Sequence, residues 1–156
     1  PFYFSISNGF TENAEDYWST AYPYLKSVNS EWDKTAPNYE VETEFTIQEL
    51  RNKFNNNNLK QDSFVILNKT AGQNINEILV GDKVYSGREF REILGLRSAD
   101  FKIKFSNNKV IITTFGYGHG VGMSQYGANE LAKQGKKYDD ILKYYYQNVK
   151  ITENFN

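Results

Sequence analysis

The sequence predicts one α+β domain over residues 1–156, with a mainly antiparallel twisted sheet or partial barrel and several short helices. Short apolar runs separated by turn residues predict hairpins. Helix-capping residues precede several segments of helical spacing. The length suits a single domain with a substantial core, and an aromatic content of 16% is too high for a disordered chain.

The first forty residues carry weak patterns. Residues 2–7 alternate loosely between apolar and polar and indicate a strand. A short helix running to Trp18 would take Thr11 as its cap. Residues 30–39 are typical of a loop, so regular structure is expected mainly after them.

Two helices are expected in the middle of the chain. Thr46 and Glu49 form a capping box before a helix that should end in the asparagine run of residues 55–58. Ser86 caps a second helix over residues 88–94, after which a glycine ends it.

Strands and hairpins account for most of the remaining middle segment. Residues 63–67 form a strand by composition, and residues 75–85 predict strands or a hairpin divided at Gly81-Asp82. Residues 101–115 predict a second hairpin with its turn at Asn107-Asn108.

The chain is expected to end in two helices and a strand. The helices are predicted over residues 123–134 and 138–147, and a short last strand over residues 149–151.

Composition excludes several classes of function. With 18 basic and 19 acidic residues there is no electrostatic case for nucleic acid. The absence of cysteine excludes a disulfide scaffold, thiol catalysis and zinc sites built on cysteine pairs. No apolar run approaches the roughly 20 residues of a membrane helix. Because the first residue is Pro1 and not Met, we expect the chain to be a piece of a longer or processed protein.

The glycine segment of residues 116–122 is the most informative stretch. Four glycines alternate with Tyr117, His119 and Val121, so an extended backbone would place all four on one face. Such a face lets either a ligand or another backbone approach closely. A phosphate-binding loop is disfavoured, because no Gly-Lys-Ser/Thr follows and Val121 stands where a dinucleotide fingerprint needs glycine.

Ser124 could be a nucleophile with His119, the one histidine, as its base. The Gly-x-Ser-x-Gly spacing is absent, since Tyr126 stands two residues after Ser124, and no acid is evident to orient the histidine. A polar substrate-binding role for Ser124, Gln125 and Tyr126 is more economical. No group of carboxylates suggests that His119 binds a metal, so no metal and no cofactor are expected.

The residues 116–128 resemble the signature segment of the SpoIID family, which comprises stage II sporulation protein D and its relatives, including LytB-type autolysin modifiers. Further matches follow in order along nearly the whole chain. They lie in residues 5–13, 24–28, 87–89, 94–98 and 141–146, and at Phe101.

The resemblance implies a peptidoglycan lytic transglycosylase with a groove for glycan strands. In that family a glutamate protonates the oxygen between N-acetylmuramic acid and N-acetylglucosamine. The muramic 6-hydroxyl then attacks and leaves a 1,6-anhydro end. The family's glutamate lies in a segment with no counterpart in this chain, so the resemblance assigns no catalytic acid here and places the chain in the larger, C-terminal part of the domain.

The positions that match the family's motifs form the predicted glycan-binding set. The zinc site of some members is not expected, because Phe4 replaces its histidine and cysteine is absent. The predicted set consists of Ser7, Thr11, Glu12, Asn13, Tyr117, His119, Ser124, Gln125 and Tyr126.

The resemblance also implies a setting. We expect a sporulation protein of a Gram-positive bacterium that acts outside the membrane, with a membrane anchor outside this chain or as a secreted wall protein. Its partners would be denuded peptidoglycan strands, an amidase and membrane sporulation proteins. The alternative is a non-catalytic glycan-binding modifier that activates an autolysin.

Overall fold

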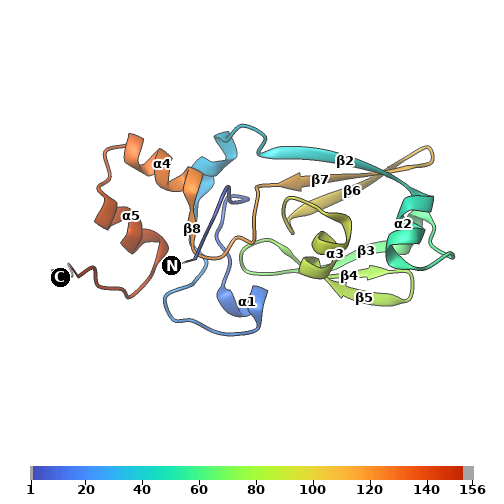
Figure 1. Ribbon diagram of the computed structural model, residues 1–156, viewed down its shortest axis with the longest axis horizontal. Helices are drawn as coiled ribbons and strands as arrows, with labels where there is room; N and C mark the ends of the chain where they lie inside the picture. Colours follow the sequence, from blue (N-terminus) through green and yellow to red (C-terminus); the bar gives the residue numbers. More distant parts are fainter. Residues whose placement is uncertain (1, 153–156) are drawn as a thin grey trace.

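The computed structural model describes residues 2–152. The molecule is elongated, with two three-stranded antiparallel sheets towards one end and helices α4 (Gln125–Lys133) and α5 (Tyr138–Tyr145) at the other (Figure 1). The segments between them carry the candidate site.

The first sheet has the strand order β2-β7-β6 and confirms the second predicted hairpin. Strands β6 (Phe101–Ser106) and β7 (Lys109–Phe115) pair antiparallel around the Asn107-Asn108 turn. Strand β2 (Glu40–Thr46) pairs with the other edge of β7 and was not expected. Its side chains are mostly exposed glutamates and threonines, and only Phe45 is buried, so its apolar signal is weak.

The second sheet has the order β3-β4-β5 and confirms the expected strand and hairpin. Strand β3 (Phe64–Lys69) pairs with β4 (Ile75–Val80), which pairs with β5 (Lys83–Ser86). Both sheets have free edges and neither closes on itself, so the antiparallel-sheet form of the predicted fold is confirmed and the barrel form is not.

Helices α2 (Ile47–Phe54) and α3 (Gly87–Leu94) begin and end as their capping signals predict. The Thr46 hydroxyl accepts the Glu49 N–H and the Ser86 hydroxyl accepts the Glu89 N–H, and in each case the glutamate returns a bond to the cap backbone. Helix α2 ends at Asn55 and α3 ends at Gly95, and both of these residues have a left-handed backbone.

The other half of the molecule departs further from the sequence predictions. Strand β1 is only Tyr3–Phe4, and it pairs in parallel with β8 (Met123–Ser124), two residues that were predicted to be helical. Helix α4 therefore begins at Gln125, with the Ser124 hydroxyl accepting the Gly127 N–H as its cap.

Two further predictions in this half are wrong. Helix α1 (Ala14–Trp18) has Asn13 at its N-cap position, because the Thr11 hydroxyl is taken up by backbone groups of residues 26 and 28. The expected loop of residues 30–39 contains a 3-10 helix, η1 (Glu31–Thr35). In the sheet-rich half, a second 3-10 turn, η2 (Gln61–Ser63), directly precedes β3.

The chain after α5 forms no strand over residues 149–151 within the described part of the molecule. Helix α5 ends at Tyr145 and not at residue 147. Gln147 instead donates its backbone N–H to the Tyr24 carbonyl at 3.1 Å, and Val149 packs against a hydrophobic cluster that contains Ala14 of α1 and Leu25.

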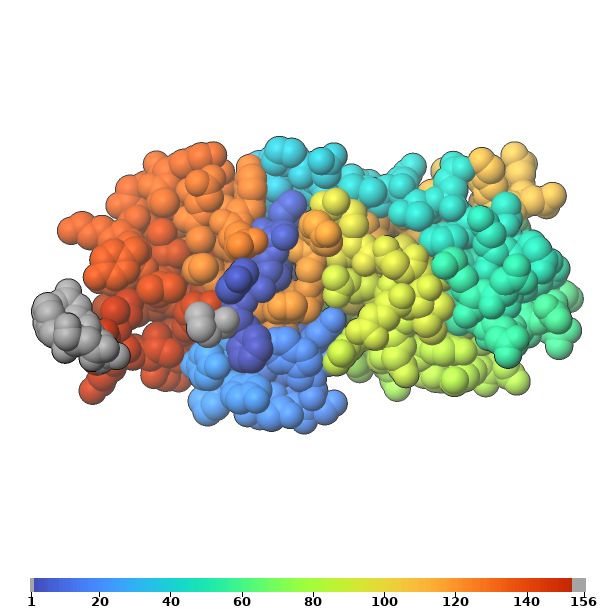
Figure 2. Space-filling model, viewed as in Figure 1, coloured from blue at the N-terminus to red at the C-terminus, as the bar shows by residue number. Residues whose placement is uncertain are grey.

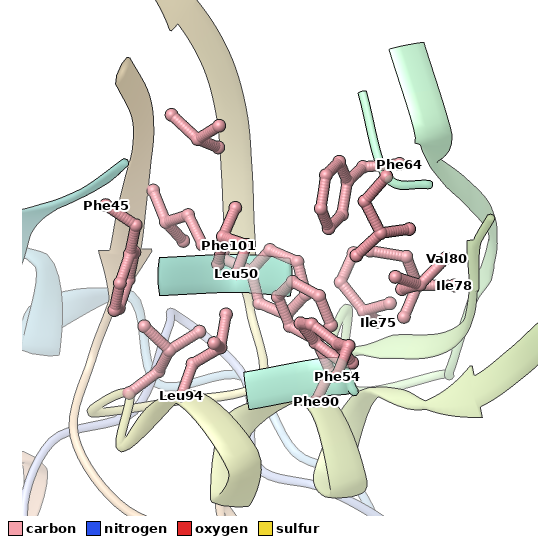
Figure 3. Close-up of a cluster of buried hydrophobic side chains, with 14 residues drawn as sticks. Phe45, Leu50, Phe54, Phe64, Ile75, Ile78, Val80, Phe90, Leu94 and Phe101 are labelled. Carbon is pink, nitrogen blue, oxygen red and sulfur yellow. The ribbon is translucent and has the colours of Figure 1, made fainter. Parts of the chain in front are cut away.

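The main hydrophobic core lies between the two sheets and helices α2 and α3 (Figure 3). Its centre is a stack of rings: the Phe90 centroid lies 4.9 Å from that of Phe101 and 5.4 Å from that of Phe54. Phe90 and Phe101 have no exposed surface. These contacts join both helices to the first sheet.

Replacing Phe90 by alanine should therefore lower the free energy of unfolding by about 3 to 5 kcal/mol, because the ring leaves a cavity in a closed core. Phe105→Ala, at a ring that is 36% exposed, is the matched control and should cost about 1 kcal/mol. Urea denaturation measures both, and equal losses would contradict this description of the core.

Candidate functional site

The glycine segment lies against residues 2–12, where the N-terminal residues cross its surface (Figure 2). Ile6 and Tyr117 exchange two backbone hydrogen bonds at 2.7 and 3.0 Å. The Gly120 carbonyl accepts the Glu12 N–H at 2.7 Å. The chain's own backbone thus makes the close approach that the glycines permit.

Gly122 shows how little space this approach leaves. Its φ is +88°, and a Cβ atom added there would lie 2.1 Å from the Phe2 carbonyl oxygen. A side chain at this position would therefore meet both backbone strain and a steric clash.

His119 lies in a cage of three aromatic rings. Its ring centroid is 5.3 Å from Trp18, 5.7 Å from Phe4 and 5.8 Å from Tyr17. Its Nδ1 accepts the Val121 backbone N–H at 3.0 Å, so Nδ1 carries no proton. Burial and, second, the positive charge of Arg91 lower the pKa of this imidazole, while a backbone hydrogen bond at Tyr3 opposes them. The ring is therefore neutral at physiological pH.

Glu12 is buried with 1% exposure, and its carboxylate accepts four hydrogen bonds. The donors are the Asn74 amide at 2.8 Å, the backbone N–H groups of Asn13 and Gly72 at 3.0 and 3.1 Å, and the Thr70 hydroxyl. Burial raises the pKa of Glu12, and the four donors act against that shift. The carboxylate fixes the turn of residues 70–74 to the segment before α1.

A second buried carboxylate, Asp33, holds residues from four segments together. It accepts hydrogen bonds from Ser7 and Ser124, each at 2.7 Å, and from Ser30. Ser30 also bonds the Tyr145 hydroxyl of α5 at 2.8 Å. Desolvation raises the pKa of Asp33, and the three serine hydroxyls oppose it.

A cleft of about 390 Å³ opens between α1 and α3, which border each other in Figure 2. Tyr17 forms one wall: the Arg88 guanidinium lies 5.0 Å from its ring centroid, and Arg91 Nη1 donates to its hydroxyl at 3.1 Å. Tyr17 also contacts His119, so the cleft and the aromatic cage share a side chain. The cleft is lined by Glu12, Asp16, Tyr17, Ser19, Thr70, Asn74, Ile75, Asn76, Ser86, Gly87, Arg88, Glu89, Glu92 and Ala99.

The cleft has the features of a site for a polar, ring-shaped ligand. It offers one aromatic face, two amides, and charged groups of both signs, of which Arg88 and Glu92 form a pair at 2.9 Å. Among residues 2–152 no group of three or more histidine, cysteine, aspartate or glutamate side chains is arranged to hold a metal ion.

The predicted glycan-binding residues divide into three groups. Glu12 lines the cleft and His119 stands behind its Tyr17 wall. Ser7, Thr11 and Ser124 are buried with at most 1% exposure and bond to the protein itself. Their predicted contact with glycan stays a prediction, and the observed role of Ser7 and Ser124 is to position backbone through Asp33.

The remaining members lie at or near the surface, outside the cleft lining. Tyr117 is 45% exposed and stacks on Arg97, whose guanidinium lies 4.2 Å from the ring centroid. Gln125 is exposed, and the Tyr126 hydroxyl donates to the Thr35 carbonyl at 3.4 Å. Asn13 bridges the Ser27 N–H and the Asp16 carboxylate. Glycan contact at these positions also stays a prediction.

The sequence reasoning missed Asp33, Tyr17, Arg88 and Asn74 as site residues. Asp33 lies in a segment whose sequence predicts a loop, and a lone aspartate carries no pattern. Tyr17 and Asn74 come from separate elements, so no spacing connects them. Arg88 had a signal, since it belongs to one of the segments on which the family resemblance rests.

Gly122→Ala should destabilise the protein more than Gly135→Ala, which has a nearly identical φ of +87° but no atom within 4 Å of the added Cβ. Both variants share the left-handed backbone penalty of about 1 to 2 kcal/mol. The clash should add about 1 to 3 kcal/mol at Gly122 alone. Equal thermal and urea stabilities would show that the N-terminal segment does not constrain the glycine.

His119 should titrate below its ordinary pKa of about 6.5. Because the unfolded chain then binds the proton more readily, the stabilisation is complete above that pH and is lost as the pH falls through the folded pKa. The imidazole resonance in NMR measures the midpoint. The free energy of unfolding should fall less between pH 7 and 5 in His119→Gln, and the same fall in both proteins would contradict it.

Comparison with known proteins gives one consistent result, although no protein-family model matches the chain. Stage II sporulation protein D of Bacillus subtilis and that of Bacillus amyloliquefaciens are each 50% identical over 97% of this chain. The amidase enhancer of B. subtilis is 24% identical over 96% of it.

The chain spans 44% of the length of each of the two sporulation proteins and 29% of the amidase enhancer. No helix in residues 2–152 has the length and apolar character needed to cross a membrane. Half of the aligned positions are identical to the sporulation proteins across nearly the whole chain. The chain belongs to the SpoIID family, the family of stage II sporulation protein D.

Proposed function

We propose that this chain is the glycan-binding part of a peptidoglycan lytic transglycosylase that acts in sporulation. The observation that carries the proposal is the cleft between α1 and α3, in a chain that shares half of its residues with stage II sporulation protein D. A tyrosine ring held between two arginines, with amides beside it, suits the apolar face and hydroxyl groups of a sugar.

The proposed division of labour assigns binding to this chain and proton donation to another segment of the complete protein. A general acid must keep a proton that it can give to the glycosidic oxygen. Burial raises the pKa of Glu12, but both oxygens of this carboxyl already accept hydrogen bonds from the protein, four in all, so neither is free to reach a glycosidic oxygen. Glu12 is therefore better suited to holding the cleft together than to acid catalysis.

The proposed setting is the outer side of the membrane. There the protein would act on strands that an amidase has stripped of their stem peptides, together with membrane sporulation proteins. The match to a protein named amidase enhancer supports the link to an amidase. The same match favours the alternative function, a glycan-binding modifier that stimulates an autolysin without cleaving glycan itself.

The test of the enzymatic role is a chimera in which this chain replaces the matching 44% of the B. subtilis sporulation protein. Denuded glycan strands are incubated with the chimera, with the B. subtilis protein and with this chain alone, and the products are analysed by mass spectrometry. We expect 1,6-anhydro ends from the first two. A folded chimera that binds strands but yields no such ends, beside an active B. subtilis protein, would favour the modifier.

The cleft itself is tested by Tyr17→Leu. Loss of the ring should weaken binding of denuded strands by about tenfold, the equivalent of one aromatic contact of about 1.4 kcal/mol. Tyr138→Leu is the matched control, because Tyr138 is 66% exposed on α5 and lies outside the cleft. Co-sedimentation with insoluble strands measures both, and equal binding by the two variants would locate the glycan elsewhere.

A further inference from the structure

A second hollow, of about 260 Å³, lies where the N-terminal segment and η1 meet the two sheets. The turn of residues 70–74 joins it to the cleft: Thr70 and Asn74 line the cleft, whereas Lys69 and Gln73 line this hollow. We call it the lysine hollow, and it is lined by Asn8, Phe10, Lys34, Tyr39, Lys69, Gln73, Asp100, Lys102 and Phe115.

The lysine hollow is locally positive in a chain whose net charge is −1. Three lysines and one aspartate line it, and that aspartate is paired with Lys69, whose Nζ lies 3.0 Å from Asp100 Oδ1. Two further carboxylates, Asp33 and Glu40, lie outside the lining but act on the Tyr39 hydroxyl. Among residues 2–152, the ion-pair contact of Lys34 is a solvent-exposed one with Glu31 at 3.6 Å, a geometry that contributes little. Within the described part of the chain, neither Lys34 nor Lys102 forms an ion pair with another residue that lines the hollow.

Aromatic rings and amides form the rest of the lining. The centroids of Tyr39 and Phe115 are 6.0 Å apart, and the Lys102 ammonium lies 5.3 Å from the Phe115 centroid. The Tyr39 hydroxyl donates to the Asn8 carbonyl at 2.7 Å, which fixes the ring. Burial and nearby carboxylates raise the pKa of Tyr39 to about 12, so this ring stays neutral.

The backbone at the rim is held in an unusual conformation. Gln73 is exposed and has a φ of +66°, a left-handed value that is uncommon for a residue with a side chain. The turn is nevertheless fixed, because the Gln73 N–H donates to the Thr70 carbonyl at 3.1 Å and Asn8 donates to the Gly72 carbonyl at 2.9 Å. Conformations of this kind persist where the surrounding contacts impose them.

We propose that the lysine hollow binds an acidic saccharide, with the sugar ring against Tyr39 and Phe115 and its carboxylate or phosphate between Lys34 and Lys102. Lysine ammonium groups act as point charges and accept either anion without a fixed geometry. The aromatic rings contact the apolar face of a sugar, and a simple anion has no such face. This site is separate from the cleft and does not depend on whether the protein cleaves glycan.

The test uses this chain and four soluble probes: N-acetylmuramic acid, N-acetylglucosamine 6-phosphate, neutral N-acetylglucosamine and inorganic phosphate. NMR titration of backbone amides measures each affinity. We expect the two acidic sugars to bind more tightly than the neutral sugar and than phosphate, with shifts centred on the hollow. Binding should weaken as salt is raised, because these charges are open to solvent. The relative affinities of the two acidic sugars distinguish the carboxylate from the phosphate as the preferred anion.

The variant Lys34→Gln/Lys102→Gln should weaken binding of both acidic sugars at least tenfold. Lys53→Gln/Lys133→Gln removes the same charge at exposed positions on α2 and α4 and should leave binding unchanged. Equal binding of the neutral sugar, a preference for inorganic phosphate over every sugar, or equal losses in the two variants would each overturn the proposal. Salt dependence in the unaltered chain keeps the test valid if a variant misfolds.

Discussion

The structure depends on the close approach between the glycine segment and residues 2–12. The two stretches are far apart in sequence, and they meet because Gly118 and Gly122 have no side chain where Phe4 and Phe2 pass. This contact places Glu12 beside the turn of residues 70–74, puts the His119 ring against Tyr17 and Trp18, and seats β1 next to β8. The cleft and the lysine hollow both lie around this junction.

Several residues of the signature motifs are buried, and their polar groups bond to the protein itself. Ser124 was interpreted from its motif as a polar group for substrate, yet its hydroxyl accepts the Gly127 N–H and donates to Asp33. Glu12 is similarly saturated by its four donors. The polar groups of these motif residues form hydrogen bonds inside the protein, where an unpaired polar group would cost about 1 to 3 kcal/mol.

Local signals made the sheet-rich half of the fold predictable. Capping boxes at Thr46 and Ser86, and turns at Gly81 and Asn107, each involve residues within four positions, so they act before any tertiary contact. Strand β2 escaped because it is held by its pairing with β7, while its own side chains are mostly polar and exposed. The parallel pairing of β1 with β8 joins residues 120 positions apart, and no local pattern encodes it.

The hydrogen-bonded set of Asp33 and its three serines has an evolutionary consequence. A substitution at Ser7, Ser30 or Ser124 withdraws one hydrogen bond from a carboxylate that has no exposed surface, whereas replacing Asp33 strands three hydroxyls. Single steps away from this arrangement are all costly, and a concerted change to apolar residues avoids the cost. The set should therefore be inherited together or replaced together.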